Sequence, residues 1–159
     1  MAKIVLGMAA SHGPLLATPP EQWDQRVEAD RRNPALVYRE GTFKFDELAR
    51  LRSKENLEEQ IRLPVKQQRY DACQRAMAEM ARVFKEVKPD VAVLVGNDQM
   101  EVFEDANIPA FMVCFGENLD NIPFSDEQKK RLPPGIEIAE PNHHGNSAQS
   151  YPGHPKLGR

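Results

Sequence analysis

His12 stands in the run Ser11-His12-Gly13-Pro14, directly after a short apolar stretch. An imidazole in such a loop can ligate a metal, act as a general base, or simply cap a backbone group. The neighbouring glycine and proline favour a functional role, because they fix the backbone and let a ligand approach closely. His12 is therefore the first candidate metal ligand.

A second polar group follows the apolar stretch at 90–95. It contains two amides and two carboxylates, namely Asn97, Asp98, Gln99 and Glu101. Carboxylate oxygens can bind a metal or a polar substrate. Asp98 fits equally well as a cap of the turn that leaves the stretch, and a solvated position fits Glu101 better than a ligand role. Asp98, Gln99 and Glu101 are kept with His12 as candidates for one metal site.

Three further histidines lie near the C-terminal end of the sequence. His143 and His144 are adjacent, so their side chains point apart and a surface loop is the default interpretation for both. His154 stands between Gly153 and Pro155, and this placement again combines a histidine with backbone-shaping residues. We therefore add His154 as a candidate catalytic residue.

The elements that must position these residues follow an α/β pattern. Buried strands are predicted at 3–8, 90–95 and 110–115, where short apolar runs rich in β-branched or aromatic residues end near turn formers. Helices are predicted at 19–32, 43–52, 55–61 and 64–88. The last helix carries an apolar stripe at three- and four-residue steps and is stopped by Pro89.

This order of elements predicts an α/β fold with a mostly parallel sheet flanked by helices. The carboxyl ends of parallel strands share one edge of the sheet, where ligands bind. We therefore expect His12 and the group at 97–101 to meet there. Residues 1–116 are predicted to form this α/β core. Residues 117–159 form a proline-rich extension, with a short helix at 125–131 and a strand at 136–138, which we interpret as the remainder of a truncated domain.

The composition favours a soluble globular protein. The chain has 159 residues, a formal net charge of -3 and 28% charged residues, so it lacks the basic stripe that nucleic-acid binding requires. A Gly-rich phosphate-binding turn is absent, and no apolar stretch reaches the length of a membrane span. Cys73 and Cys114 lie inside apolar patterns, which favours reduced thiols and a cytoplasmic location.

Three stretches resemble the class III extradiol ring-cleavage dioxygenases, the superfamily of the protocatechuate 4,5-dioxygenase catalytic subunit. Residues 10–14 (ASHGP) resemble its Ser-His-x-Pro loop. Residues 89–98 (PDVAVLVGND) resemble its Pro-Asp-Val strand, which runs into an Asn-Asp turn. Residues 153–157 (GHPKL) are similar to its Gly-His-Pro stretch. The three stretches occur in the family's order and cover the whole chain.

The resemblance implies a non-haem Fe(II) cofactor held by two histidines and one glutamate. It implies a catechol-type aromatic diol and dioxygen as substrates. His12 would be the first iron ligand, and His154 a second-sphere histidine that contacts substrate or oxygen and helps proton transfer. No nucleic acid or membrane partner is expected.

Two departures from the family pattern limit this expectation. Gln99 stands where the family has its second iron histidine, so either Asp98 or Glu101 compensates or the metal site is altered. The family's glutamate ligand would lie beyond Arg159. We therefore expect a fragment, or a subunit that needs a second copy or a complementing partner, and no ring cleavage by this chain alone. Gln99 also favours the alternative of a non-catalytic metal-binding or protein-interaction relative.

Overall fold

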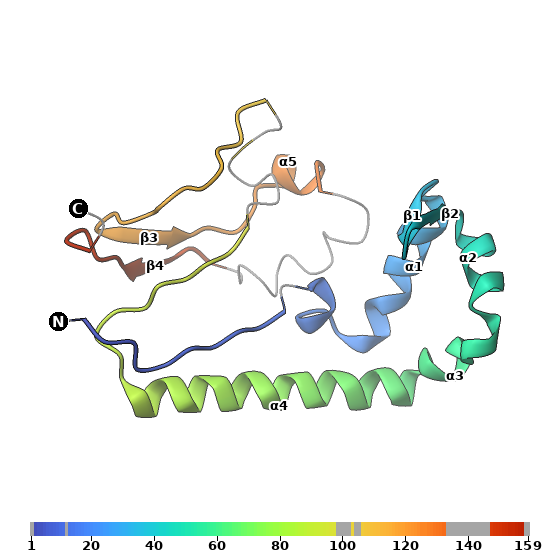
Figure 1. The fold of residues 1–159 in the computed structure, drawn as a ribbon, viewed down its shortest axis with the longest axis horizontal. Coiled ribbons are helices and arrows are strands. Elements are labelled where there is room, and N and C mark those ends of the chain that lie inside the picture. Colours follow the sequence, from blue (N-terminus) through green and yellow to red (C-terminus); the bar gives the residue numbers. More distant parts are fainter. Residues whose placement is uncertain (1, 12, 98–102, 104–105, 133–146, 158–159) are drawn as a thin grey trace.

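The computed structural model describes residues 2–11, 13–97, 103, 106–132 and 147–157. Helices dominate its first half, and short strands occur in two separate places (Figure 1). The helical elements are η1 (Pro14–Leu16), η2 (Pro20–Gln22), α1 (Trp23–Arg32), α2 (Phe45–Leu51), η3 (Ser53–Glu55), α3 (Leu57–Gln60), α4 (Leu63–Val87) and α5 (Asp126–Lys129). The strands are β1 (Leu36–Tyr38), β2 (Gly41–Phe43), β3 (Asn118–Asn121) and β4 (Gln149–Pro152).

Helix α4 is the longest element, and it confirms the helix predicted at 64–88. Pro64 occupies its first turn, where the missing N–H of proline costs nothing. The helix ends because Lys88 adopts a left-handed conformation with φ 47° and donates its N–H to the Phe84 carbonyl over 3.0 Å. Pro89 follows and prevents another turn. The apolar stripe of α4 remains half-exposed, so its neighbours cover it only in part.

The best-buried residues lie where η1 and η2 pack against α4 and α1 contacts η2. Thr18 is 1% exposed, and its carbonyl accepts a hydrogen bond from Trp23 Nε1 at 2.9 Å. Lys66 on α4 is 6% exposed, and its ammonium lies 2.5 Å from a carboxylate oxygen of Asp24 on α1. This unit around Thr18 and Lys66 is the nearest equivalent of a core in the described chain.

Strands β1 and β2 form an antiparallel hairpin in which Leu36 pairs with Phe43 and Tyr38 with Gly41. Arg39 opens the two-residue turn with φ 54°, in the left-handed region that few side chains adopt. The Phe43 ring packs closely over Gly41, where a Cβ would lie 2.7 Å from it, so a larger residue would force the ring to move. Helix α2 follows, and Glu47 in its first turn accepts the Lys44 N–H at 2.9 Å.

Strands β3 and β4 are also antiparallel, although they come from distant parts of the sequence. Asn118 pairs with Pro152 and Asn121 with Gln149. Helix α5 begins near the end of β3, where Ser125 and Gln128 exchange side-chain and backbone hydrogen bonds in a capping box. This arrangement confirms a short helix in the predicted range 125–131, whereas the strand predicted at 136–138 lies outside the described residues.

The predicted fold class is wrong. The described residues form two separate antiparallel sheets of two strands each, not a mostly parallel sheet. Segments 3–8, 90–95 and 110–115, predicted as its strands, form no strand. Residue preference shows that a segment suits a strand, but a strand exists only where a second backbone accepts its hydrogen bonds. The predicted domain boundary at residue 116 stays a prediction. Residues 1–116, however, do not form the α/β core that was expected of them.

No helix in the described ranges combines the length and the apolar character needed to cross a lipid bilayer.

Candidate functional site

The loop around position 12 is held by hydrogen bonds on both sides of the candidate ligand. Gly13 donates its backbone N–H to Ser11 Oγ at 3.2 Å, and Leu16 donates to the Gly13 carbonyl at 3.0 Å. A serine side chain that accepts from the second following residue is a common way to tighten a turn. His12 itself lies outside the described residues. The backbone that enters and leaves position 12 is nevertheless defined.

Helix α4 anchors this loop from outside. Gln74 Nε2 donates to the Leu16 carbonyl over 2.8 Å, at the end of η1. The same helix holds α1 through the buried ammonium of Lys66. Through Gln74 the loop rests on the longest helix of the described chain, and a rigid support of this kind is what a binding side chain needs. Sequence reasoning missed both contacts, because Lys66 and Gln74 read as ordinary polar positions of a helix.

The structure describes only one residue of the second predicted polar group at 97–101. Asn97 is exposed at the end of the segment that leaves α4, while Asp98, Gln99 and Glu101 lie outside the described residues. The mechanism expected to bring this group to His12 was the shared edge of a parallel sheet. That mechanism is wrong, because neither segment 3–8 nor segment 90–95 is a strand. No structural evidence therefore joins the two groups.

His154 is exposed and lies on the turn after β4. Its carbonyl accepts the Leu157 N–H at 3.0 Å, which closes this turn. Immediately before it, Gly153 donates its N–H to the Glu117 carbonyl at 2.8 Å. A Cβ on Gly153 would lie 1.9 Å from the Gly116 carbonyl oxygen, so only glycine fits there. The backbone on the N-terminal side of His154 is therefore fixed against residues 116–117.

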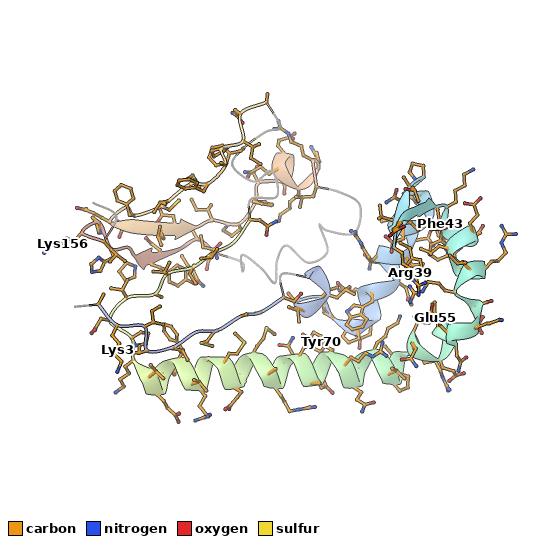
Figure 2. All side chains as sticks on the ribbon, in the orientation of Figure 1. Lys3, Arg39, Phe43, Glu55, Tyr70 and Lys156 are labelled. Carbon is orange, nitrogen blue, oxygen red and sulfur yellow. The ribbon has the colours of Figure 1, made fainter. Side chains whose placement is uncertain are left out.

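The charged cluster around Tyr38 is a second polar feature that the sequence did not reveal. The guanidinium groups of Arg39 and Arg52 lie 5.2 and 5.0 Å from the centre of the Tyr38 ring. Figure 2 shows Arg39, Phe43 and Glu55 together at the end of the molecule that carries the β1–β2 hairpin. A cavity of about 270 Å³ opens beside them, between the hairpin and the end of α2.

Arg52 and Glu55 form an ion pair in this cluster, so their charges neutralise each other. Arg52 donates two hydrogen bonds to the Glu55 carboxylate, at 3.0 and 2.7 Å. These bonds hold the pKa of Glu55 below its usual range and raise the pKa of Arg52. Each carboxylate of the cluster thus has a guanidinium nearby, and the arrangement fits a role in holding the hairpin on α2 better than a ligand site.

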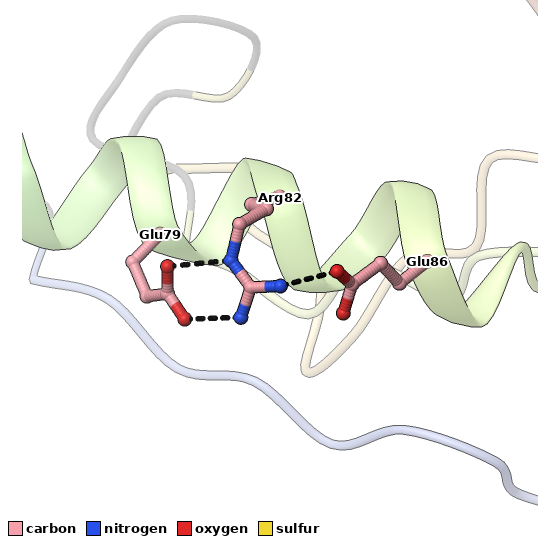
Figure 3. A network of polar contacts seen from close by, with 3 residues as sticks. All are labelled: Glu79, Arg82 and Glu86. Atoms are coloured by element: carbon pink, nitrogen blue, oxygen red, sulfur yellow. Dashed lines mark hydrogen bonds and ion pairs between the residues drawn. The ribbon is translucent and has the colours of Figure 1, made fainter.

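A second network of ion pairs lies on an exposed face of α4. Arg82 lies between Glu79 and Glu86 and donates hydrogen bonds to both (Figure 3). The two bonds from Arg82 hold the pKa of Glu79 below its usual range. All three side chains are exposed and spaced three or four residues apart along the helix. This network is typical of a solvated helix face.

The donor chemistry at the candidate metal residues fits a divalent metal. His12 offers an imidazole nitrogen, and Asp98 and Glu101 offer carboxylate oxygens, which are donor types found in non-haem iron sites. Gln99 offers only a neutral amide oxygen. Among the residues that the structure describes, no cluster of three histidine, cysteine, aspartate or glutamate side chains could hold a metal ion. The four candidates lie outside that set, so their roles stay predictions.

Comparison with protein-family models, with curated proteins and with solved structures finds no match to this chain.

Proposed function

We propose that this chain carries part of a non-haem Fe(II) site of the extradiol dioxygenase type, with His12 as an iron ligand. The support from sequence is the occurrence of three family-like stretches in the family's order. The structural observation that carries the proposal is the anchored loop: the backbone on both sides of position 12 is fixed by Ser11, Gly13 and Gln74. A metal ligand gains affinity from such a preformed support.

Asp98 and Glu101 are the proposed carboxylate donors beside His12. When bound, Fe(II) supplies open positions at which an aromatic diol and dioxygen can react with ring opening. The anchored loop would hold the backbone of its described residues in place before the metal arrives, which lowers the entropy lost on binding. Gln99 would contribute a weaker donor than imidazole, so we expect a lower Fe(II) affinity than that of a two-histidine site.

His154 is the proposed proton-transfer residue of the same activity. Its exposure leaves the imidazole open to solvent and substrate, and histidine is the side chain that most often transfers protons in enzymes. The contact between Gly153 and Gly116 defines where the chain enters the turn, and so limits the positions available to the imidazole. Because His154 is not a proposed ligand, its removal should leave iron binding intact.

Anaerobic titration with Fe(II), in which calorimetry measures the binding, tests the assignment of His12 as an iron ligand. We expect His12→Ala to lose Fe(II) binding, because it removes the only imidazole among the four proposed metal-site residues. His154→Ala is the matched control, since it removes an imidazole from a position outside the proposed metal site. Equal iron binding by His12→Ala and the unmodified chain would show that the site is misassigned.

Gln99→His tests the same site by adding a donor. Imidazole is a better ligand for iron than a neutral amide. We expect Fe(II) affinity to increase by about tenfold or more, which is the size of change that even indirect neighbours of a metal produce. An affinity that is unchanged or lower in Gln99→His would place residue 99 outside the metal site.

A second function, metal binding without ring cleavage, is favoured by the same Gln99. Oxygen uptake by the iron-loaded chain with protocatechuate, gallate and catechol, together with anaerobic binding of these diols, separates the two functions. Oxygen consumption with any of these diols, lost in His154→Ala, supports the dioxygenase. Because this chain alone is not expected to cleave rings, binding of a diol only when iron is present also supports the dioxygenase site, whereas iron binding without either diol binding or oxygen consumption supports the non-catalytic relative.

A further inference from the structure

Two uncharged apolar segments lie exposed in the second half of the chain. The first is 91–96 (VAVLVG) and the second is 110–116 (AFMVCFG), and together we call them the apolar segments. Leu94 and Val95 are 89% and 95% exposed, and Phe111 is 83% exposed. Isolated apolar residues are common on protein surfaces, but runs of consecutive exposed ones mark an interaction site.

The backbone of the apolar segments also lacks partners of its own. Within the described residues, strand pairing joins only β1 with β2 and β3 with β4. In the same described part of the chain, no backbone hydrogen bond of another kind involves residues 91–96 or 110–116. Extended chain with free N–H and C=O groups is a template for adding a strand from another polypeptide. Both the side chains and the backbone of these segments are therefore suited to β-pairing.

The size of the exposed surface supports a stable contact. The chain exposes 13166 Å² at a mass of 18.0 kDa. A compact monomer of that mass would expose about 8,000 Å². The difference is several times the area of about 800 Å² that each partner buries in a standard interface. An interface formed by the apolar segments would therefore use only part of the surplus.

We propose that the apolar segments form the interface between two copies of this chain. A second copy fits better than a charged partner, because neither segment carries Asp, Glu, Lys, Arg or His, and identical segments meet without like-charge repulsion. A two-fold axis places each segment antiparallel to its own copy, so the free N–H and C=O groups can pair. The chain's net charge of -3 opposes this approach only weakly.

Analytical ultracentrifugation of the full chain at micromolar concentration tests this interface. We expect a discrete species of twice the 18.0 kDa chain mass. Val93→Lys and Val113→Lys, one in each segment, should each raise the dimer dissociation constant about tenfold or more, because the two-fold axis brings two ammonium groups together. Val37→Lys is the matched control: Val37 is 78% exposed in β1, outside both segments, and should leave the dimer unchanged.

Hydrogen exchange separates strand pairing from mere crowding of apolar side chains. Amides at 91–96 and 110–116 should gain protection as the dimer forms, and both lysine variants should lose it. Circular dichroism confirms that α4 is retained in the variants. A monomer at all concentrations, a continuous distribution of aggregates, an equal effect of Val37→Lys, or a dimer without protected amides in these segments would each overturn the proposal. Because iron takes no part, these outcomes are independent of the metal titration.

Discussion

Lys66 is the one charged side chain that is buried in the described part of the chain, and its partner Asp24 lies on a different helix. The Lys66 ammonium is 2.5 Å from the Asp24 carboxylate, whereas the Asp24 side chain is 74% exposed. We predict that Asp24→Ala destabilises the unit formed by η1, η2, α1 and α4, because it leaves a buried ammonium without its acceptor. Lys66→Met should be milder, since it keeps an apolar stem and removes the charge.

The exposure of Asp24 sets the size of this effect. A hydrogen bond to a charged group contributes about 1.5–3 kcal/mol, and breaking a fully buried ion pair costs about 3–5 kcal/mol. Water reaches Asp24 and can partly replace it beside Lys66. We therefore expect Asp24→Ala to lower the free energy of unfolding by about 1–3 kcal/mol, and Lys66→Met by less than about 1 kcal/mol. The double variant Asp24→Ala/Lys66→Met should have the same free energy of unfolding as Lys66→Met alone.

Urea denaturation followed by far-ultraviolet circular dichroism measures these free energies. Asp30→Ala is the matched control, because Asp30 lies on the same helix and forms an exposed pair with Arg26 at 3.9 Å. Such a pair contributes about 0–1 kcal/mol, so this variant should stay close to the unmodified chain. If Asp24→Ala is no less stable than Asp30→Ala, or if adding Lys66→Met does not restore stability, the buried ammonium is not what joins the two helices.

Two other features give predictions of their own. Gly153→Ala should open the β3–β4 pairing, because the added Cβ would collide with the Gly116 carbonyl oxygen. The rate of amide hydrogen exchange in β3 should therefore rise. Gly7→Ala is the control, because a Cβ on Gly7 meets no other atom of the described residues, and it should leave this exchange rate unchanged. The hydrogen bonds from Arg52 lower the folded pKa of Glu55, so its contribution to stability is present above the ordinary carboxyl pKa and is lost as pH falls through the lowered value. Acid titration by circular dichroism should therefore show a smaller loss of stability at low pH in Glu55→Gln than in the unmodified chain.

The helices could be predicted because their signals are local. The range 64–88 was predicted from apolar spacing and Pro89, and α4 spans Leu63–Val87. The helix predicted at 19–32 corresponds to η2 and α1, and those at 43–52 and 55–61 contain α2 and α3. In each case the spacing of apolar residues, a proline or a capping side chain lies within a few positions of the helix that it specifies.

The strands could not be predicted in the same way. β1 and β2 lie within or beside the range 33–42, where no strand is predicted, and the left-handed Arg39 at their turn gives no glycine or asparagine signal. β3 (NLDN) and β4 (QSYP) are polar and have weak strand preference. They form because Gly153 can approach Gly116 closely, and this contact joins residues that are far apart in the sequence.

The same distinction applies to the candidate site. Residue types and local order pointed to His12 and His154, because glycine, serine and proline beside a histidine are visible in a few letters. The contacts that support the His12 loop and the helix after it are long-range: Gln74 is 58 positions from Leu16, and Lys66 is 42 positions from Asp24 on α1. A helix periodicity shows that Gln74 and Lys66 share a helix, but not which loop or helix each one contacts. The supports of the proposed site can therefore be tested independently of its ligands, and loss of the Gln74 hydrogen bond should loosen the loop whether or not His12 binds iron.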